Sequence, residues 1–119
     1  MNGLHILAEF RACGGDPALL EEVGRLAALC REACTDGGLT AVAEAFHQFP
    51  GAGATGALVL AESHLAVHTW PELGAVTLDL YVCNHSRDNR AAAEAVYARL
   101  QHAFRPESTV RRDIERGAP

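Results

Sequence analysis

Residues 56–83 read GALVLAESHLAVHTWPELGAVTLDLYVC, and this stretch decides the fold. Its two ends, 56–61 and 75–83, are apolar or alternate between apolar and polar residues, which is the pattern of β-strands. Between them, residues 62–72 contain a Ser hydroxyl, two imidazoles, two carboxylates and the only Trp of the chain. Strands form a rigid scaffold on which polar functional groups are often placed. The stretch therefore predicts a sheet that carries a functional site.

The residues on both sides of this stretch predict two helices and further strands. Asp16 and Pro17 are typical of a helix start, and apolar residues at helical spacing follow until Gly37-Gly38. A second amphipathic helix is predicted over residues 92–104, ending before Pro106. The remaining strands are predicted over residues 3–10, 39–49 and 108–116.

This order of elements predicts an α+β fold, a two-layer sandwich in which an antiparallel sheet carries two helices on one face. Along the strand 75–83, an apolar set alternates with a second set, Thr77, Asp79, Tyr81 and Cys83. The apolar set is expected to contact the helices, and the second set to form the other face together with His68 and Trp70. A face with exposed aromatic residues is rarely left in water, so we expect a second copy of the chain to cover it.

Composition limits the class of protein. A length of 119 residues predicts one domain, residues 1–119, and 49% hydrophobic with 21% charged residues is typical of a globular fold. No apolar run reaches the roughly 20 residues of a membrane span, and the N-terminal residues do not resemble a signal peptide. The net charge of −5 argues against a nucleic-acid partner. We expect a cytoplasmic protein with free thiols at all four Cys positions, 13, 30, 34 and 83.

The chain contains no Lys, because all ten of its basic residues are Arg. A pyridoxal phosphate enzyme needs a Lys to hold its cofactor. If this chain forms a Schiff base with an amine substrate, the carbonyl must come from another source. A pyruvoyl group made from an internal Ser is such a source.

The run 62–72 resembles the signature of the short bacterial and archaeal S-adenosylmethionine decarboxylase proenzymes, ESHL, any residue, an aliphatic residue, then HTWPE. The similarity extends over nearly the whole chain. It implies a pyruvoyl-dependent enzyme that cuts itself between Glu62 and Ser63 into a β chain, 1–62, and an α chain, 63–119. It also implies a homodimer in which two sheets pack face to face, giving four layers, helix-sheet-sheet-helix.

The resemblance assigns roles to residues that would otherwise have plainer interpretations, as a turn Ser, a core His and a buried Cys. Ser63 is implied to be the nucleophile of self-cleavage and the source of the pyruvoyl group. His68 is implied to be the base that removes the Ser63 α-proton, and Cys83 the acid that reprotonates the substrate carbon after CO2 leaves. Thr55 stands where the family commonly has Ser, and its hydroxyl is implied to support processing. Asn84 stands where the family usually has Gly.

Phe49, Trp70 and Glu72 resemble the substrate-binding positions of the family. Adenine stacks on aromatic rings, a sulfonium is attracted to them, and a carboxylate can accept both ribose hydroxyls. The plainer interpretation is that the two aromatic residues pack in the core or an interface and that Glu72 belongs to a turn.

No metal site is predicted. His64 and His68 lie four residues apart, which on a strand separates them by about 13 Å, too far to share one ion. Cys30 and Cys34 fall one turn apart on the first helix and are expected to pack in the core.

The sequence therefore predicts a self-processing S-adenosylmethionine decarboxylase that supplies the aminopropyl donor for spermidine biosynthesis. Two alternatives remain open. One is a pyruvoyl-dependent arginine or ornithine decarboxylase on the same scaffold. The other is an unprocessed, non-catalytic paralogue.

Overall fold

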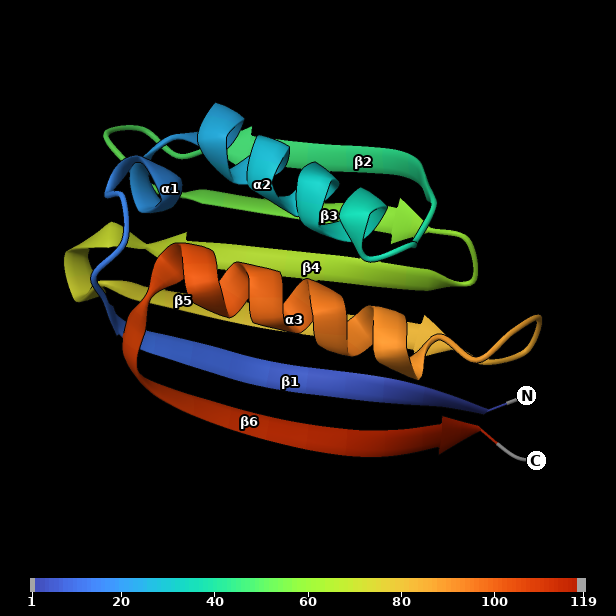
Figure 1. Cartoon of the computed structure of the whole chain (residues 1–119). Helices are drawn as coiled ribbons and strands as arrows, with labels where there is room; N and C mark the ends of the chain where they lie inside the picture. The colour runs from blue at the N-terminus through green and yellow to red at the C-terminus, as the bar shows by residue number, and fades with distance from the viewer. Residues whose placement is uncertain (1, 118–119) are drawn as a thin grey trace.

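The computed structural model describes residues 2–117, and Figure 1 shows them as one sheet with the helices on one of its faces. The six strands are β1 (Asn2–Cys13), β2 (Ala41–Gln48), β3 (Ala54–Leu60), β4 (Ser63–Trp70), β5 (Ala75–Cys83) and β6 (Pro106–Gly117). The helices are α1 (Ala18–Glu21), α2 (Val23–Asp36) and α3 (Arg90–Phe104), with a short 3₁₀ turn, η1, at Pro71–Leu73. The strand order is β2-β3-β4-β5-β1-β6, and every neighbouring pair is antiparallel. The predicted α+β class is confirmed, and the order of strands and helices is as predicted except in the first helical segment.

The first predicted helix is broken in two, which corrects the expectation of two helices. Glu22 is extended (φ −116°, ψ 121°) and separates α1 from α2. The end of β2 satisfies the backbone groups that this break exposes. The Gln48 side chain accepts a hydrogen bond from the Val23 N–H at 2.7 Å and donates one to the Glu21 carbonyl at 2.8 Å. These contacts are tertiary, so helical periodicity could not reveal the break.

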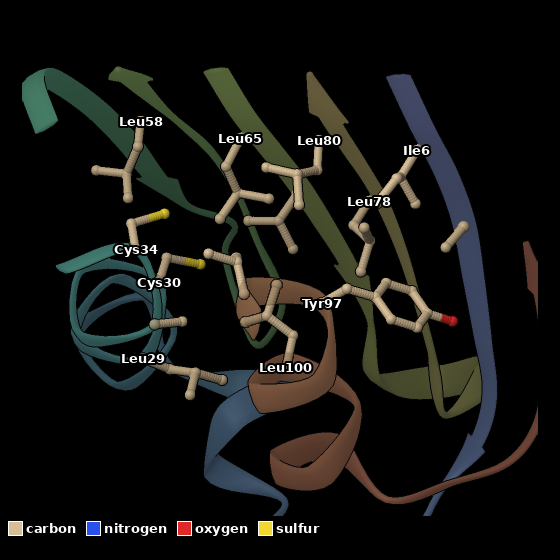
Figure 2. Close-up of a cluster of buried hydrophobic side chains, with 14 of the residues drawn as sticks. Ile6, Leu29, Cys30, Cys34, Leu58, Leu65, Leu78, Leu80, Tyr97 and Leu100 are labelled. Carbon is tan, nitrogen blue, oxygen red and sulfur yellow. The ribbon is translucent and has the colours of Figure 1, made fainter. Parts of the chain in front are cut away.

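The core lies between the helices and one face of the sheet (Figure 2). Strands β4 and β5 supply Leu65, Leu78 and Leu80, and the helices supply Leu29, Cys30, Cys34 and Leu100 among others. Burial raises the pKa of Cys30 to about 12 and that of Cys34 to about 11, so both stay protonated near neutral pH. These two Cys residues therefore pack as small apolar side chains, as predicted, and all four Cys residues are free.

The second face of the sheet carries the chemistry-bearing side chains, and within residues 2–117 no helix covers it (Figure 1). Val76, Leu78, Leu80 and Val82 are buried on the helix side, whereas Thr77, Asp79 and Tyr81 are only partly buried on the other side. We call this second side the open face. Strand register places His68 opposite Thr77 and Ala66 opposite Asp79, so β4 and β5 contribute side by side to the open face. None of the described helices is both long enough and apolar enough to cross a bilayer.

Candidate active site

The predicted cleavage position lies in the tight turn between β3 and β4. Leu60 pairs with Ser63, so Ala61 and Glu62 are the two turn residues. Glu62 has a φ of 64°, in the left-handed region that is costly for a residue with a side chain. Its carboxylate accepts a hydrogen bond of 2.7 Å from the Ser86 hydroxyl. The bond between Glu62 and Ser63 is thus part of a strained turn held at a fixed position.

Ser63 and Cys83 come together at this end of the sheet. Ser63 is the first residue of β4 and Cys83 is the last residue of β5, and both are buried. The Cys83 backbone N–H donates to Ser63 Oγ at 3.2 Å. Burial and the neighbouring Cys83 raise the pKa of Tyr81, which keeps its hydroxyl neutral on the same face. The nucleophile and the acid implied by the resemblance are therefore neighbours within one chain.

His68 lies at the opposite end of β4, paired in register with Thr55 on β3. The Thr55 hydroxyl and His68 Nδ1 form a short hydrogen bond. This contact fixes the orientation of the imidazole and leaves Nε2 free of that hydroxyl. Thr55 and His68 therefore form a second group of side chains, separate from the group at Ser63.

A cavity of about 310 Å³ adjoins His68 and contains the three residues predicted to bind substrate, Phe49, Trp70 and Glu72. Trp70 follows His68 on the same face, and the centroids of their rings are 5.9 Å apart. The side chains of Phe49 and Trp70 are each more than one-third exposed. Glu72 lies in η1, where the αL conformation of Gly74 (φ 62°) closes the turn. An aromatic cavity with one carboxylate can stack a flat base and accept hydrogen bonds from a diol.

The two groups do not meet within one chain. Ser63 and His68 are five residues apart on a single strand, which separates them by about 16 Å. An imidazole can remove a proton only from within hydrogen-bond reach. The Ser63 group and the His68 group therefore lie at opposite ends of β4.

Sequence reasoning missed a cluster on the open face, near the Ser63 end of β4. Register places His5 on β1 and His64 on β4 opposite the same residue of β5, Tyr81. Nε2 of both imidazoles contacts one oxygen of Asp79, at 3.2 Å for His64. Alternation placed His64 and Asp79 on this face, but only the strand order brings β1 beside β5.

Each of these three residues offers one atom that could ligate a metal ion, and the three atoms lie within 4.8 Å of one another. Arg116 adds a positive charge, with Nη1 3.4 Å from His5 Nδ1 and its guanidinium carbon 4.8 Å from the centre of the Tyr81 ring. A neighbouring guanidinium disfavours a cation, and hydrogen bonds to the carboxylate already pair the two imidazoles. We therefore describe His5, His64 and Asp79 as a hydrogen-bonded cluster.

This chain is similar to known proteins over most of its length. The family model for S-adenosylmethionine decarboxylase matches residues 4–117. The S-adenosylmethionine decarboxylase proenzyme of Thermoplasma acidophilum is 40% identical over 97% of this chain and 83% of its own length. The proenzyme of Pyrococcus horikoshii is 32% identical over 95% of this chain and 80% of its own length.

A solved structure shares the whole fold. The crystal structure of the adenosylmethionine decarboxylase from Aquifex aeolicus VF5 superposes with a TM-score of 0.88 at 31% identity, covering 98% of this chain and 92% of that one. The shared fold therefore extends over nearly the whole of both chains. Family model, relatives and fold lead to one conclusion: the chain belongs to the S-adenosylmethionine decarboxylase family.

Proposed function

We propose that this chain cuts itself between Glu62 and Ser63 and then decarboxylates S-adenosylmethionine, supplying the aminopropyl donor for spermidine. The observation that carries the proposal is the turn at Glu62, which is strained, tethered and followed directly by a hydroxyl. The products would be a β chain, 1–62, and an α chain, 63–119, that begins with a pyruvoyl group. The residues present fit that group, because Ser63 supplies its three carbon atoms. Four free thiols suit the reducing cytoplasm, where we place the enzyme.

Self-cleavage begins with attack of Ser63 Oγ on the Glu62 carbonyl carbon, which turns the amide into an ester and frees the Ser63 nitrogen. Removal of the Ser63 α-proton by an imidazole expels the Glu62 carboxylate and leaves dehydroalanine. Addition of water and loss of ammonia then give the pyruvoyl group. The left-handed conformation at Glu62 costs about 1–2 kcal/mol, and cleavage releases this strain. The turn thereby favours the cut chain.

The base must come from a second subunit. Each chain separates Ser63 from His68 by about 16 Å, and sheets packed face to face are about 10 Å apart. A two-fold axis that lies between the two sheets and runs perpendicular to the strands would place the Ser63 end of one β4 over the His68 end of the other β4. A homodimer of this kind forms two complete sites, in which Ser63 and Cys83 of one protomer face Thr55 and His68 of the partner subunit.

The cavity of Phe49, Trp70 and Glu72 would bind the nucleoside part of the substrate. The adenine would stack on the aromatic rings, and the carboxylate would accept the ribose hydroxyls. In the dimer this cavity adjoins the Ser63 end of the partner subunit. The pyruvoyl carbonyl, when present, supplies the electrophile that takes up the amine and the electrons released with CO2. Cys83 would deliver the proton that completes the reaction.

The substrate assignment is tested by assaying the purified protein with S-adenosylmethionine, arginine and ornithine side by side. We expect CO2 release from S-adenosylmethionine alone. Glu72→Ala should lower kcat/KM for it about 10- to 100-fold, because hydrogen bonds to a charged group are worth about 1.5–3 kcal/mol. Glu107→Ala, on the far edge strand β6, is the matched control and should leave kcat/KM unchanged. Turnover of arginine or ornithine instead would identify the alternative decarboxylase.

Cys83→Ala should separate processing from turnover. Self-cleavage is expected to proceed, because the Cys83 N–H that holds Ser63 Oγ belongs to the backbone. Turnover should fall by about 100-fold or more, the usual contribution of a positioned acid. Mass spectrometry should also detect α chains that begin with alanine, formed when the proton reaches the wrong carbon. Cys13→Ala is the control for loss of a thiol. Wild-type turnover in a fully cut Cys83→Ala protein would remove Cys83 as the proton donor.

A further inference from the structure

Asn89 ties together the loop between β5 and α3, on which the proposed site depends. Its side chain is buried, with a relative exposure of 6%. Nδ2 donates to the Cys83 carbonyl at 2.8 Å, and Oδ1 accepts a bond of 2.8 Å from Arg87 Nε. The Asn89 carbonyl also accepts the Ala93 N–H at 2.9 Å, in the first turn of α3. Both polar ends of this amide are therefore paired inside the fold.

Asn84 orients Asn89 from the other side of the loop. The Asn84 side-chain oxygen accepts the Asn89 backbone N–H at 2.8 Å, and the Asn84 N–H donates to the Asn2 carbonyl at 2.8 Å. A Gly at position 84 offers no such side-chain acceptor. The residue that departs from the family pattern thus holds Asn89 in place.

We propose that Asn89 is a positioning residue for self-cleavage, acting through Cys83. Its amide fixes the Cys83 carbonyl, and the N–H of that same Cys83 holds Ser63 Oγ at 3.2 Å. The same loop holds the other side of the cleavage position through the Ser86–Glu62 hydrogen bond. The loop therefore fixes both the attacking oxygen and the residue that carries the attacked carbonyl. This inference rests on the proposed self-cleavage.

The reason for a measurable effect is geometric. Attack by Oγ on the preceding carbonyl requires reacting atoms about 3–3.5 Å apart and aligned, and a displacement of about 1 Å can cost roughly 100-fold in rate. A buried amide with both ends bonded restricts the Cys83 backbone more strongly than solvent-exposed contacts do. Loss of the Nδ2 donor also leaves a buried carbonyl without its partner, which favours a shift of the β5 end.

The test compares Asn89→Asp with wild type in cell-free translation, where the appearance of the two fragments is followed over time by denaturing mass spectrometry. The substitution keeps the shape and the acceptor for Arg87, but places a carboxylate oxygen against the Cys83 carbonyl. We expect cleavage to be at least about tenfold slower near neutral pH. Asn84→Ala keeps the Nδ2 donor of Asn89 but removes the side-chain oxygen that accepts the Asn89 N–H. It should slow cleavage about threefold.

A pH profile separates positioning from general destabilisation. Burial of the introduced carboxyl opposes its ionisation, whereas the Arg87 guanidinium favours it. Once protonated at low pH, this carboxyl can donate to the Cys83 carbonyl as the amide does. The rate of Asn89→Asp relative to wild type should therefore rise as pH falls. Val96→Ala serves as the stability control, because it removes buried methyl groups from the same helix α3 and leaves a cavity. It should lower Tm without changing the cleavage rate.

Wild-type cleavage rates in folded Asn89→Asp and Asn84→Ala proteins would overturn the inference while leaving self-cleavage intact. Should Asn89→Asp not fold, the rate of Asn84→Ala decides alone. Failure of the wild-type chain to cleave would refute the proposed function itself, so the two failures are distinguishable.

Discussion

Ser63→Ala is expected to remain a single uncut chain without decarboxylase activity. The substitution removes the only atom that can attack the Glu62 carbonyl from the following residue, and with it the oxygen that must leave with the Glu62 carboxylate to give dehydroalanine. The change leaves the Cys83 N–H without its acceptor, which costs about 1–3 kcal/mol of stability. This loss is small enough that the fold should persist. Denaturing mass spectrometry measures the cut fraction, and circular dichroism checks the fold.

Ser108→Ala is the control for this experiment. It removes a hydroxyl from the exposed part of β6, so it should cut and turn over like wild type. Fragments that end at Glu62 in the Ser63→Ala protein would show that another nucleophile or a contaminating protease makes the cut.

Co-expression of Ser63→Ala with His68→Ala is expected to restore cleavage that neither protein shows alone. In a Ser63→Ala homodimer no chain has a nucleophile, and in a His68→Ala homodimer no site has the base. A mixed dimer places both defects in one site and leaves the other site with Ser63 of the His68→Ala chain and His68 of the Ser63→Ala chain. The cut fraction of His68→Ala chains should therefore rise from near zero to the fraction of those chains that are paired with a Ser63→Ala chain.

The readout of this mixing experiment is specific, because the two chains differ in mass. Only fragments of the His68→Ala chain should appear, and native mass spectrometry should locate them in mixed dimers. Separately, hydroxylamine should cut His68→Ala homodimers if they stop at the ester. If verified mixed dimers stay uncut, the site does not combine Ser63 and His68 from different chains. Processing of His68→Ala on its own would remove His68 as the base.

Local patterns predicted the sheet well because they report directly on burial. Alternation along 75–83 placed Val76 and Leu80 against the helices and Asp79 on the open face, as observed. Periodicity predicted two helical segments, of which the structure divides the first at Glu22. Pro106 begins β6 two residues before the predicted strand. An edge strand tolerates such a Pro, because one side of its backbone needs no partner.

Features that depend on tertiary contacts could not be predicted from local patterns in the sequence. The break at Glu22 depends on Gln48, more than twenty residues away in the chain. The cluster of His5, His64 and Asp79 depends on β1 lying beside β5, which no spacing rule reveals. The motif placed Ser63 and His68 close together in sequence, yet an extended strand holds them apart. This separation is the reason for which we propose that a second subunit completes the site.

The intact mass of the purified wild-type protein under denaturing conditions tests the central claim most directly. Self-cleavage predicts two fragments, residues 1–62 ending in a free carboxyl at Glu62 and residues 63–119 lighter by one ammonia than a fragment that begins with intact Ser63. The lighter mass is the signature of the pyruvoyl group and of a blocked N-terminus. A single uncut chain, or an α chain that begins with unmodified Ser63, would contradict the account.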